Sequence, residues 1–571
     1  MAPLLSRTKS MTAAIYYHPD AYTTGGPKLM GRNVAGESFL RGFLAYSKAT
    51  EFWVQVHQPE HSKLFAQAAM NAGRVEPVHI TDKNNLGTLS KSQVLHFPGP
   101  NIGELAWQRA AFGHGLWSLC GITHTTSSSK AMDAIAELLT APVQEWDAVI
   151  CTSTAVKDNV TRLLQAHADY LGHRLGAQRL VLPQLPVIPL GIHTKDFTYS
   201  NLQRQRARQK LAVNASTIVV LYVGRLSFQA KAHPLAMYQA LERAAASLPT
   251  GKTLLLVECG WHGHDTIARA FADAARVACP SVRIVTLDGR DAKARETAWA
   301  GADVFCSLSD NIQETFGLVP VEAMAAGLPV VVSDWDGYKD TIRDGVDGFR
   351  IPTLMPSAGL GTDLALRHAL MIDNYDMYCG QVSSMVAVDI DAAAQAFSRL
   401  FASPERRRQM GEAGRVHARQ FYDWEVIIPQ YESLWEQLIE VRKAQSGKLR
   451  SLAHPWPARM DPFHGFGSYP TRALTLQTEL RMVDADFDVS SRRLSDYSGL
   501  VMVNFAKKVL PSSDEILGIL EHVGPGPQTA ASIVQRLPPD RQGFVFRSLV
   551  WLVKLGILAI ADATHPPTGS S

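Results

Sequence analysis

The sequence predicts an α/β protein with two doubly wound domains and a small, mainly helical domain after them. Short apolar runs alternate with amphipathic stretches up to about residue 445, a pattern that is typical of parallel strands covered by helices on both faces. The alternation stops after that point. A chain of 571 residues, of which 46% are hydrophobic, is also long enough for roughly three or four domains.

The first predicted domain spans residues 11–192. Apolar runs predict its strands, and helices are expected between them, including 34–48 and 132–146. A proline-rich stretch, 183–193, is expected to lead into the next domain. The predicted strands are 12–17, 52–56, 94–97, 116–124 and 147–153.

The second predicted domain spans residues 193–445 and repeats the pattern. The basic run 204–210 near its start is expected to form a solvated helix face. Two such Rossmann-like halves that face each other would hold a ligand in the crevice at the carboxyl ends of their strands. The predicted strands of this half are 217–223, 253–257, 282–286, 303–309 and 329–333.

The segment 314–333 carries the most informative motif of the chain. A crossover helix is expected between the strands on either side, with Gly317 at its start. Free backbone N–H groups and the positive end of the helix dipole make such a start a binding site for phosphate. Glu314 precedes the helix, and Glu322 lies eight positions later. This spacing suits a ligand with phosphate in its middle and hydroxyl groups at both ends, such as a sugar nucleotide.

A second motif follows the predicted strand 217–223. The loop after this strand carries Arg225 and, six positions later, Lys231. Two fixed cations at the carboxyl end of a strand suit a departing diphosphate, because negative charge builds on it as a glycosidic bond breaks.

The two motifs resemble the signature of retaining nucleotide-sugar glycosyltransferases of the GT-B fold, in particular family 4, the glycosyl transferases group 1. Glu-x7-Glu is followed by Ala-x-Ala-x-Gly-Leu-Pro-Val-Val, and Gly-Arg-Leu is followed by Lys, in the family's order. The resemblance covers roughly residues 11–445. Within this range, the segment 354–388 is longer than is usual in the family and has no assigned role beyond that of an interaction surface.

The resemblance implies a role for each residue of the two motifs. Glu314 would contact the donor sugar, and the backbone of Gly317 and Leu318 would bind the diphosphate. Glu322 would hold the ribose hydroxyl groups. The two cations of the second motif would bind the donor phosphates.

Two further candidate sites lie in the first domain. Gly31 and Arg32 belong to a glycine-rich loop, and we expect them to approach the diphosphate or the acceptor. Family members commonly have a Gly-Gly pair directly before the helix, whereas here Arg32 and Asn33 follow Gly31, and a flexible turn is the alternative. His124 ends the strand 116–124. The resemblance places a histidine near the reacting sugar, where His124 would orient donor or acceptor hydroxyl groups, and a histidine satisfied by local backbone groups is the alternative.

The resemblance implies an enzyme that moves a sugar from a nucleoside diphosphate-sugar to an acceptor hydroxyl with retention of anomeric configuration. It implies no enzymic nucleophile, no obligatory cofactor and no metal, because stabilisation of the departing diphosphate carries the rate. Two rival functions stay open. One is a GT-B enzyme of different chemistry, such as an epimerase or a phosphorylase. The other is a ligand sensor or scaffold whose output is the C-terminal helical module.

Composition bears on partners and location. The net charge is +3, from 56 basic and 53 acidic residues, so we do not expect binding to nucleic acid, which requires a basic excess. The six cysteines lack metal-ligand spacing and indicate reduced thiols. No signal-peptide pattern and no run of ~20 apolar residues is found, so the sequence predicts a cytoplasmic protein without a transmembrane segment.

The end of the chain is expected to lie outside the glycosyltransferase core. Prolines and mixed charge predict a linker at 446–495. Residues 496–571 predict three short helices and a strand, which resemble a winged-helix module. The third helix is mostly apolar, so we expect protein contact or self-association through 496–571 rather than DNA binding.

Overall fold

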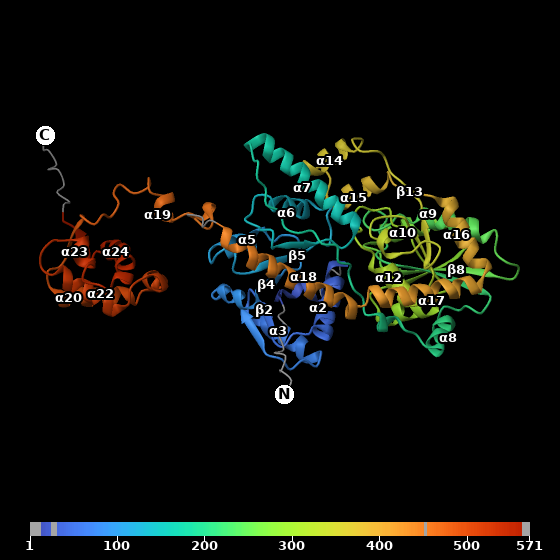
Figure 1. The fold of residues 1–571 in the computed structure, drawn as a ribbon, viewed down its shortest axis with the longest axis horizontal. Coiled ribbons are helices and arrows are strands. Elements are labelled where there is room, and N and C mark those ends of the chain that lie inside the picture. Colours follow the sequence, from blue (N-terminus) through green and yellow to red (C-terminus); the bar gives the residue numbers. More distant parts are fainter. Residues whose placement is uncertain (1–12, 24–30, 450–453, 562–571) are drawn as a thin grey trace, which may run out of the picture. The chain divides into compact units, whose positions relative to one another are not determined.

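The computed structural model describes residues 13–23, 31–449 and 454–561. The chain divides into two compact units at Trp456. The first unit holds both large sheets and the second holds the C-terminal helices (Figure 1).

The first sheet is parallel and, within the described residues, has six strands in the order β3-β2-β1-β4-β5-β6. This is the order of a doubly wound Rossmann-type sheet. The strands are β1 Ala14–Tyr16, β2 Phe52–Gln55, β3 Val78–Thr81, β4 Val94–His96, β5 Ser118–Ile122 and β6 Ala148–Ile150. The helices are α1 Pro19–Tyr22, α2 Gly31–Tyr46, α3 Pro59–Asn71, α4 Leu89–Ser92, α5 Gly103–Ala110, α6 Ser129–Glu137 and α7 Thr154–Leu175.

The second sheet repeats this architecture, with six parallel strands in the described residues in the order β12-β11-β10-β7-β8-β9. The strands are β7 Thr217–Val223, β8 Thr253–Gly260, β9 Arg283–Asp288, β10 Val304–Ser307, β11 Val330–Ser333 and β12 Gly348–Ile351. The helices are α8 Asn201–Lys210, α9 Leu235–Ala245, α10 Asp265–Ala278, α11 Ala292–Gly301, α12 Leu318–Ala325, α13 Tyr338–Thr341, α16 Ile390–Ala402, α17 Pro404–Phe421 and α18 Trp424–Gln445. The predicted fold class, two Rossmann-like halves with an added C-terminal region, is confirmed.

The sequence prediction missed one edge strand in each sheet. β3 and β12 lie at sheet edges, where only one neighbour supplies hydrogen bonds and side chains are partly exposed. The apolar run that marks a central strand, such as the fully buried β11, is therefore absent from them. The predicted helix 132–146 extends too far along the chain. The helix found in this region, α6, ends at Glu137.

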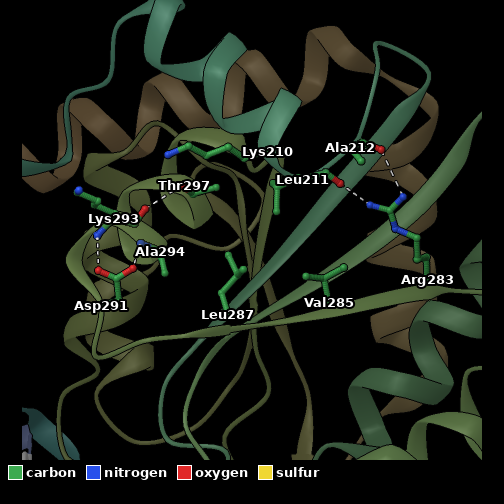
Figure 2. Close-up of a pocket in the computed structure, with 10 residues that line it drawn as sticks. All are labelled: Lys210, Leu211, Ala212, Arg283, Val285, Leu287, Asp291, Lys293, Ala294 and Thr297. Carbon is green, nitrogen blue, oxygen red and sulfur yellow. Dashed lines mark hydrogen bonds between the residues drawn. The ribbon is translucent and has the colours of Figure 1, made fainter.

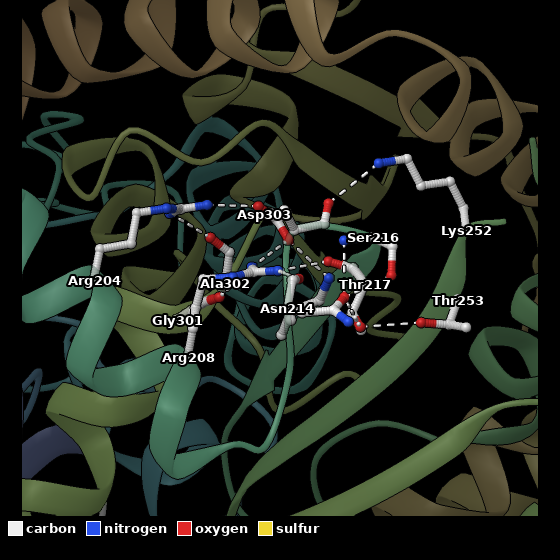
Figure 3. Close-up of polar contacts among 12 residues, drawn as sticks. Arg204, Arg208, Asn214, Ser216, Thr217, Lys252, Thr253, Gly301, Ala302 and Asp303 are labelled. Carbon is white, nitrogen blue, oxygen red and sulfur yellow. Dashed lines mark hydrogen bonds and ion pairs between the residues drawn. The ribbon is translucent and has the colours of Figure 1, made fainter.

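An ionic cluster fixes α8 to the amino end of the second sheet (Figure 3). Asp303 accepts hydrogen bonds from Arg204 Nη2 at 2.5 Å, from Arg208 Nη1 at 2.9 Å and from the Val219 N–H at 2.9 Å. Arg208 also donates to the carbonyl of Thr217 at 2.7 Å. The expectation of a solvated face for 204–210 is therefore wrong at these two arginines, which hold α8 against the start of β7 and β10.

The last helix of the first unit, α18, crosses back onto the first half of the chain (Figure 1). Trp424 Nε1 donates to Ser38 Oγ at 2.8 Å, and its ring lies so close to Gly42 and Gly191 that an added Cβ at either would come within 2.4 Å of a ring atom. Glu432 accepts from Ser47 Oγ at 2.9 Å. The two halves are thus joined by packing as well as by the connecting segment.

The second unit contains a short antiparallel sheet of order β16-β15-β17 in the described residues. Its strands are β15 Glu479–Met482, β16 Gln528–Thr529 and β17 Leu558–Ile560, and its helices are α19 Pro462–Gly465, α20 Phe487–Ser498, α21 Val501–Asn504, α22 Ser513–Val523, α23 Ala530–Val534 and α24 Pro539–Lys554. The three predicted helices are present as α22, α23 and α24. The winged-helix resemblance stays a prediction.

The structure does not show a linker over the whole of 446–495, because part of this range is folded. β15 and most of α20 fall inside this range, and Leu480 of β15 is fully buried between its neighbours β16 and β17. Only four residues of alternating burial mark β15, too short a pattern to stand out in the sequence. Among the helices within the described residues, none combines the length and apolar character that crossing a bilayer requires.

Candidate active site

The loop after β7 places Lys231 against Glu314, which follows β10. Lys231 Nζ donates to Glu314 Oε2 at 2.5 Å, although the two residues are 83 positions apart. Their side chains are 24% and 11% exposed, so the ion pair is largely removed from water. The structure thus joins the two sequence motifs at the carboxyl edge of the second sheet, where a doubly wound fold binds its ligands.

Glu314 is held in its charged form. Burial alone would raise the pKa of this carboxyl group, but the Lys231 ammonium group and hydrogen bonds from Lys231, the Thr315 N–H and Tyr338 lower the pKa below its ordinary value. Tyr338 OH donates to Glu314 Oε2 at 3.4 Å and lies 2.9 Å from Ser307 Oγ. A fixed carboxylate therefore faces the start of α12.

The start of α12 requires glycine. Gly317 has a φ of 88°, and an added Cβ would lie 2.0 Å from Tyr338 Cε1. In the described residues no side chain hydrogen-bonds the first turn of α12, and this turn contains no acidic residue. The N–H groups of Leu318 and Val319 are therefore available to an anion, which the helix dipole favours.

Glu322, one turn into α12, differs in ionisation from Glu314. Burial raises the pKa of Glu322 to about 7, against the opposing charges of Arg295 and Lys231. The side chain is half-buried. Two carboxyl groups of one site thus have pKa values pushed in opposite directions, an arrangement that is common where such groups have different roles.

Arg225 is held beside this pair. Its Nη2 donates to the carbonyl of Ala230 and to Gln313 Oε1, both at 3.0 Å. Gln313 immediately precedes Glu314 in the chain. The Arg225 guanidinium group is therefore hydrogen-bonded to the direct neighbour of an ion-pair residue. Arg225 is half-buried, and its remaining N–H groups can be offered to a phosphate.

The first half of the chain meets this site through His124 and its neighbours. Thr315 Oγ1 donates to the carbonyl oxygen of His124 at 3.0 Å, which places the end of β5 next to the Glu314 loop. The start of α7 is also bound: Ser153 Oγ donates to Asp336 Oδ1 at 3.2 Å, and the Thr154 N–H donates to Asp340 Oδ2 at 2.6 Å.

Gly31 and Arg32 are not brought to the site by any described contact. Gly31 begins α2 and is exposed, with open space around the position of a Cβ atom. The side chain of Arg32 and the loop 24–30 lie outside the described residues. Their expected contact with a diphosphate or an acceptor stays a prediction.

Sequence reasoning missed several residues that complete the site. Tyr338, Gln313 and Thr315 contact predicted site residues directly. Asp336 has a left-handed φ of 45°, and it contacts Ser153 across the interface between the halves. Only its position after a predicted strand could have indicated this contact.

The second half also has a hollow of about 480 Å³ away from these residues (Figure 2). It lies beside the edge strand β9, between the end of α8 and the start of α11. Arg283 donates to the carbonyls of Leu211 and Ala212 at its rim, and no predicted site residue lines it. The lining residues are Lys210, Leu211, Ala212, Arg283, Val285, Leu287, Asp291, Lys293, Ala294 and Thr297.

The geometry above lies within a stretch that matches a known family. Residues 203–357 match the family model of the glycosyl transferases group 1. This matched stretch contains both sequence motifs and the second sheet up to β12. In the described residues no group of three or more His, Cys, Asp or Glu side chains is arranged to hold a metal ion.

Curated relatives are similar over part of the chain. A D-inositol 3-phosphate glycosyltransferase of Mycolicibacterium vanbaalenii is 28% identical over 254 residues, which are 42% of this chain and 52% of that protein. A phosphatidyl-myo-inositol mannosyltransferase of Mycobacterium tuberculosis is 31% identical over 263 residues, 46% of this chain and 60% of that protein. The chain therefore spans about half to three-fifths of the length of these relatives.

Solved structures are similar over a larger share of the chain. A sucrose-phosphate synthase from Thermosynechococcus elongatus has a TM-score of 0.46 and 19% identity, covering 75% of this chain and 99% of that one. A glycosyltransferase from Rickettsia africae has a TM-score of 0.46 and 11% identity, with the same coverage of 75% and 99%.

Proposed function

We propose that this chain is a retaining glycosyltransferase that transfers a sugar from a nucleoside diphosphate-sugar to an acceptor hydroxyl group. The observation that carries the proposal is the Lys231–Glu314 ion pair beside Arg225 and the uncapped start of α12. Cations, free N–H groups and an ionised carboxylate converge there within a family-matched segment. This set suits a diphosphate with a hydroxyl-bearing sugar at one end.

In the proposed reaction the diphosphate is both leaving group and proton acceptor. The bond between the anomeric carbon and the diphosphate oxygen breaks, and the acceptor oxygen bonds to that carbon on the same face. The acceptor's proton passes to the departing diphosphate oxygen. Arg225, Lys231 and the α12 N–H groups stabilise the charge that develops on the diphosphate, while Glu314 orients the donor sugar and Glu322 the ribose.

The support is stronger for the donor than for the acceptor. The family-matched segment 203–357 lies wholly in the second half, whereas the first half contributes His124 and the start of α7. The relatives named above carry inositol derivatives in their names. We propose a carbohydrate or other polyhydroxylated acceptor, bound by the first half.

The direct test is hydrolysis and transfer with a panel of UDP-, GDP- and ADP-sugars by the purified protein. Arg225→Ala and Lys231→Ala should each lower turnover of the preferred donor by about 10²-fold, since each removes a donor of hydrogen bonds to the developing charge. Arg276→Ala is the matched control, because Arg276 is an exposed arginine of α10 paired with Asp273.

The outcomes separate the rival functions. Nucleotide binding without turnover of any donor would favour a ligand sensor or scaffold. Conversion of the donor to its epimer, or phosphate-dependent cleavage of a glycoside, would favour an epimerase or a phosphorylase. Normal turnover in Arg225→Ala and Lys231→Ala would place the diphosphate elsewhere.

A further inference from the structure

A helical hairpin between β12 and α16 reaches the proposed site. Its base is closed by the antiparallel strands β13 Thr353–Leu354 and β14 Ala387–Val388, and it contains α14 Thr362–Ala369 and α15 Tyr375–Ser383. This is the segment 354–388, which the sequence left without a role.

The hairpin is internally braced. Arg367 donates to both carboxylate oxygens of Asp373, at 2.7 and 2.9 Å. The rings of His368 and Tyr378 stack with 4.1 Å between centroids. Asn374 caps α15 by accepting from the Met377 N–H at 2.9 Å. These contacts join α14 to the turn before α15 and to α15 itself, and they fix the position of α15 within the hairpin.

One side chain of α15 contacts the first half of the chain. Tyr375 OH lies 3.1 Å from Ser127 Oγ and 3.4 Å from Thr125 Oγ1. Both partners belong to the loop that follows β5, directly after His124. Ser127 is buried, and its partner Tyr375 is half-buried.

Helix α15 also borders the donor side. The Gln313 side chain, which accepts from Arg225 Nη2 at 3.0 Å, is among the groups that oppose the effect of burial on the pKa of Tyr375. One turn further along α15, Gly380 approaches the loop that carries Arg225 and Lys231, because an added Cβ there would lie 3.2 Å from Gln229 Cβ. A side chain at position 380 would crowd this contact.

We propose that Tyr375 is a positioning residue that holds the loop after β5 in place against the second half, beside the loop that carries Arg225. Its hydroxyl group bonds to Ser127 in the first half, while its own helix packs at Gly380 against the Arg225 loop in the second half. The proposal rests on the proposed function, because Arg225 acts on a diphosphate only if a donor binds beside it. Tyr375 itself contacts neither donor nor acceptor.

The kinetic test is Tyr375→Phe, which keeps the ring and removes the hydroxyl group. We expect kcat for the preferred donor to fall by about tenfold or more, because displacement of reacting groups by 1 Å costs up to about 10²-fold. Affinity for the free nucleoside diphosphate should change by less than about threefold, since the donor site lies within the second half. A general structural defect would instead lower both quantities.

Matched variants isolate the hydroxyl contact. Tyr378→Phe, on the same helix but stacked on His368, should keep the wild-type kcat. Ser127→Ala should reproduce part of the loss, and the double variant Tyr375→Phe/Ser127→Ala should be no worse than Tyr375→Phe, because the two side chains share one bond. Equal activity of the Tyr375→Phe and Tyr378→Phe variants, or full additivity in the double variant, would overturn the proposal.

A second measurement does not depend on activity. Hydrogen exchange in residues 123–128 should be at least about threefold faster in Tyr375→Phe than in Tyr378→Phe, because local opening is limited by the bonds that hold a segment. If the wild type turned over no donor, the proposed function would fail, and this exchange measurement alone would decide the positioning role. Equal exchange in the two variants would exclude it.

Discussion

At the scale of single residues, the two glutamates of the α12 region differ in the pKa of their carboxyl groups. Glu314 is charged because Lys231 and hydrogen bonds from the Thr315 N–H and Tyr338 overcome its burial. Among the residues that the structure describes, Glu322 has no partner at such short distance, and burial raises its pKa to about 7. A carboxylate that accepts ribose hydroxyl groups must be ionised, so the protonation of Glu322 should control nucleotide binding near neutral pH.

We predict that affinity for the nucleoside diphosphate rises with pH through about 7 in the wild type. Below this pKa the affinity should fall by up to about tenfold per pH unit, because each unit lowers the ionised fraction of Glu322 about tenfold. Glu322→Gln should bind more weakly at pH 8 and lack this dependence. Calorimetric titration of both proteins from pH 5.5 to pH 8.5 measures it.

The ratio of wild-type to Glu322→Gln affinity is the informative quantity. Ionisation of the ligand's own phosphates affects both proteins equally and cancels in this ratio. A ratio that stays constant with pH would show that Glu322 does not hold the ribose in its charged form.

At the scale of elements, the start of α7 is bound by carboxyl groups from the other half. Asp336 lies next to Ser153, and Asp340 accepts from the Thr154 N–H. Burial, followed by the negative charges of Glu314 and Asp340, raises the pKa of Asp336 to about 8. The folded protein therefore binds a proton at Asp336 more tightly than the unfolded chain does.

This shift predicts a pH-dependent loss of stability. Since the folded pKa of Asp336 exceeds its unfolded value of 3.8, its contribution to the free energy of unfolding falls as pH rises from about 4 to about 8. Asp336→Asn lacks the titrating group, and Asn tolerates the left-handed φ. The variant should be more stable than the wild type by a margin that grows by up to about 1.4 kcal/mol per pH unit between about pH 4 and about pH 8.

Urea unfolding of both proteins at pH 5, 6.5 and 8 checks this prediction. Asp336→Asn keeps a side-chain oxygen for the hydrogen bond from Ser153, so the contact itself need not be lost. A stability difference that does not change between pH 5 and pH 8 would contradict the raised pKa.

The elements also show what the sequence could and could not predict. β7, β8, β10 and β11 are almost entirely buried and appear as apolar runs, so their loops could be placed with the motifs they carry. β3, β12 and β15 have no such run. The arginine partners of Asp303 and the contacts of Tyr375 with the loop after β5 could not be predicted, because they join residues 95 or more positions apart through packing that leaves no local pattern.

At the scale of the whole molecule, every proposed site residue lies in the first unit, and the second unit has a core of its own. Leu480, Ile519 and Leu549 of this core are fully buried. Other apolar side chains of the second unit are exposed, including Val501 at 85% and Phe505 at 80%. Exposed apolar side chains that gather in one segment are typical of protein contacts, which agrees with the proposal of a partner or of self-association.

We therefore predict that a chain ending at Trp456 keeps donor turnover within about twofold of the full chain, because it retains all the contacts that position the site. It should differ from the full chain in oligomer size by light scattering, or lose a partner that the full chain captures.

A chain ending at residue 490 is the control. It keeps β15 without β16 and β17, leaving Leu480 and an unpaired strand edge exposed, so it should aggregate. Loss of turnover in a folded chain ending at Trp456 would instead assign the second unit a part in catalysis, and an unchanged oligomer size with no lost partner would remove the proposal of protein contact.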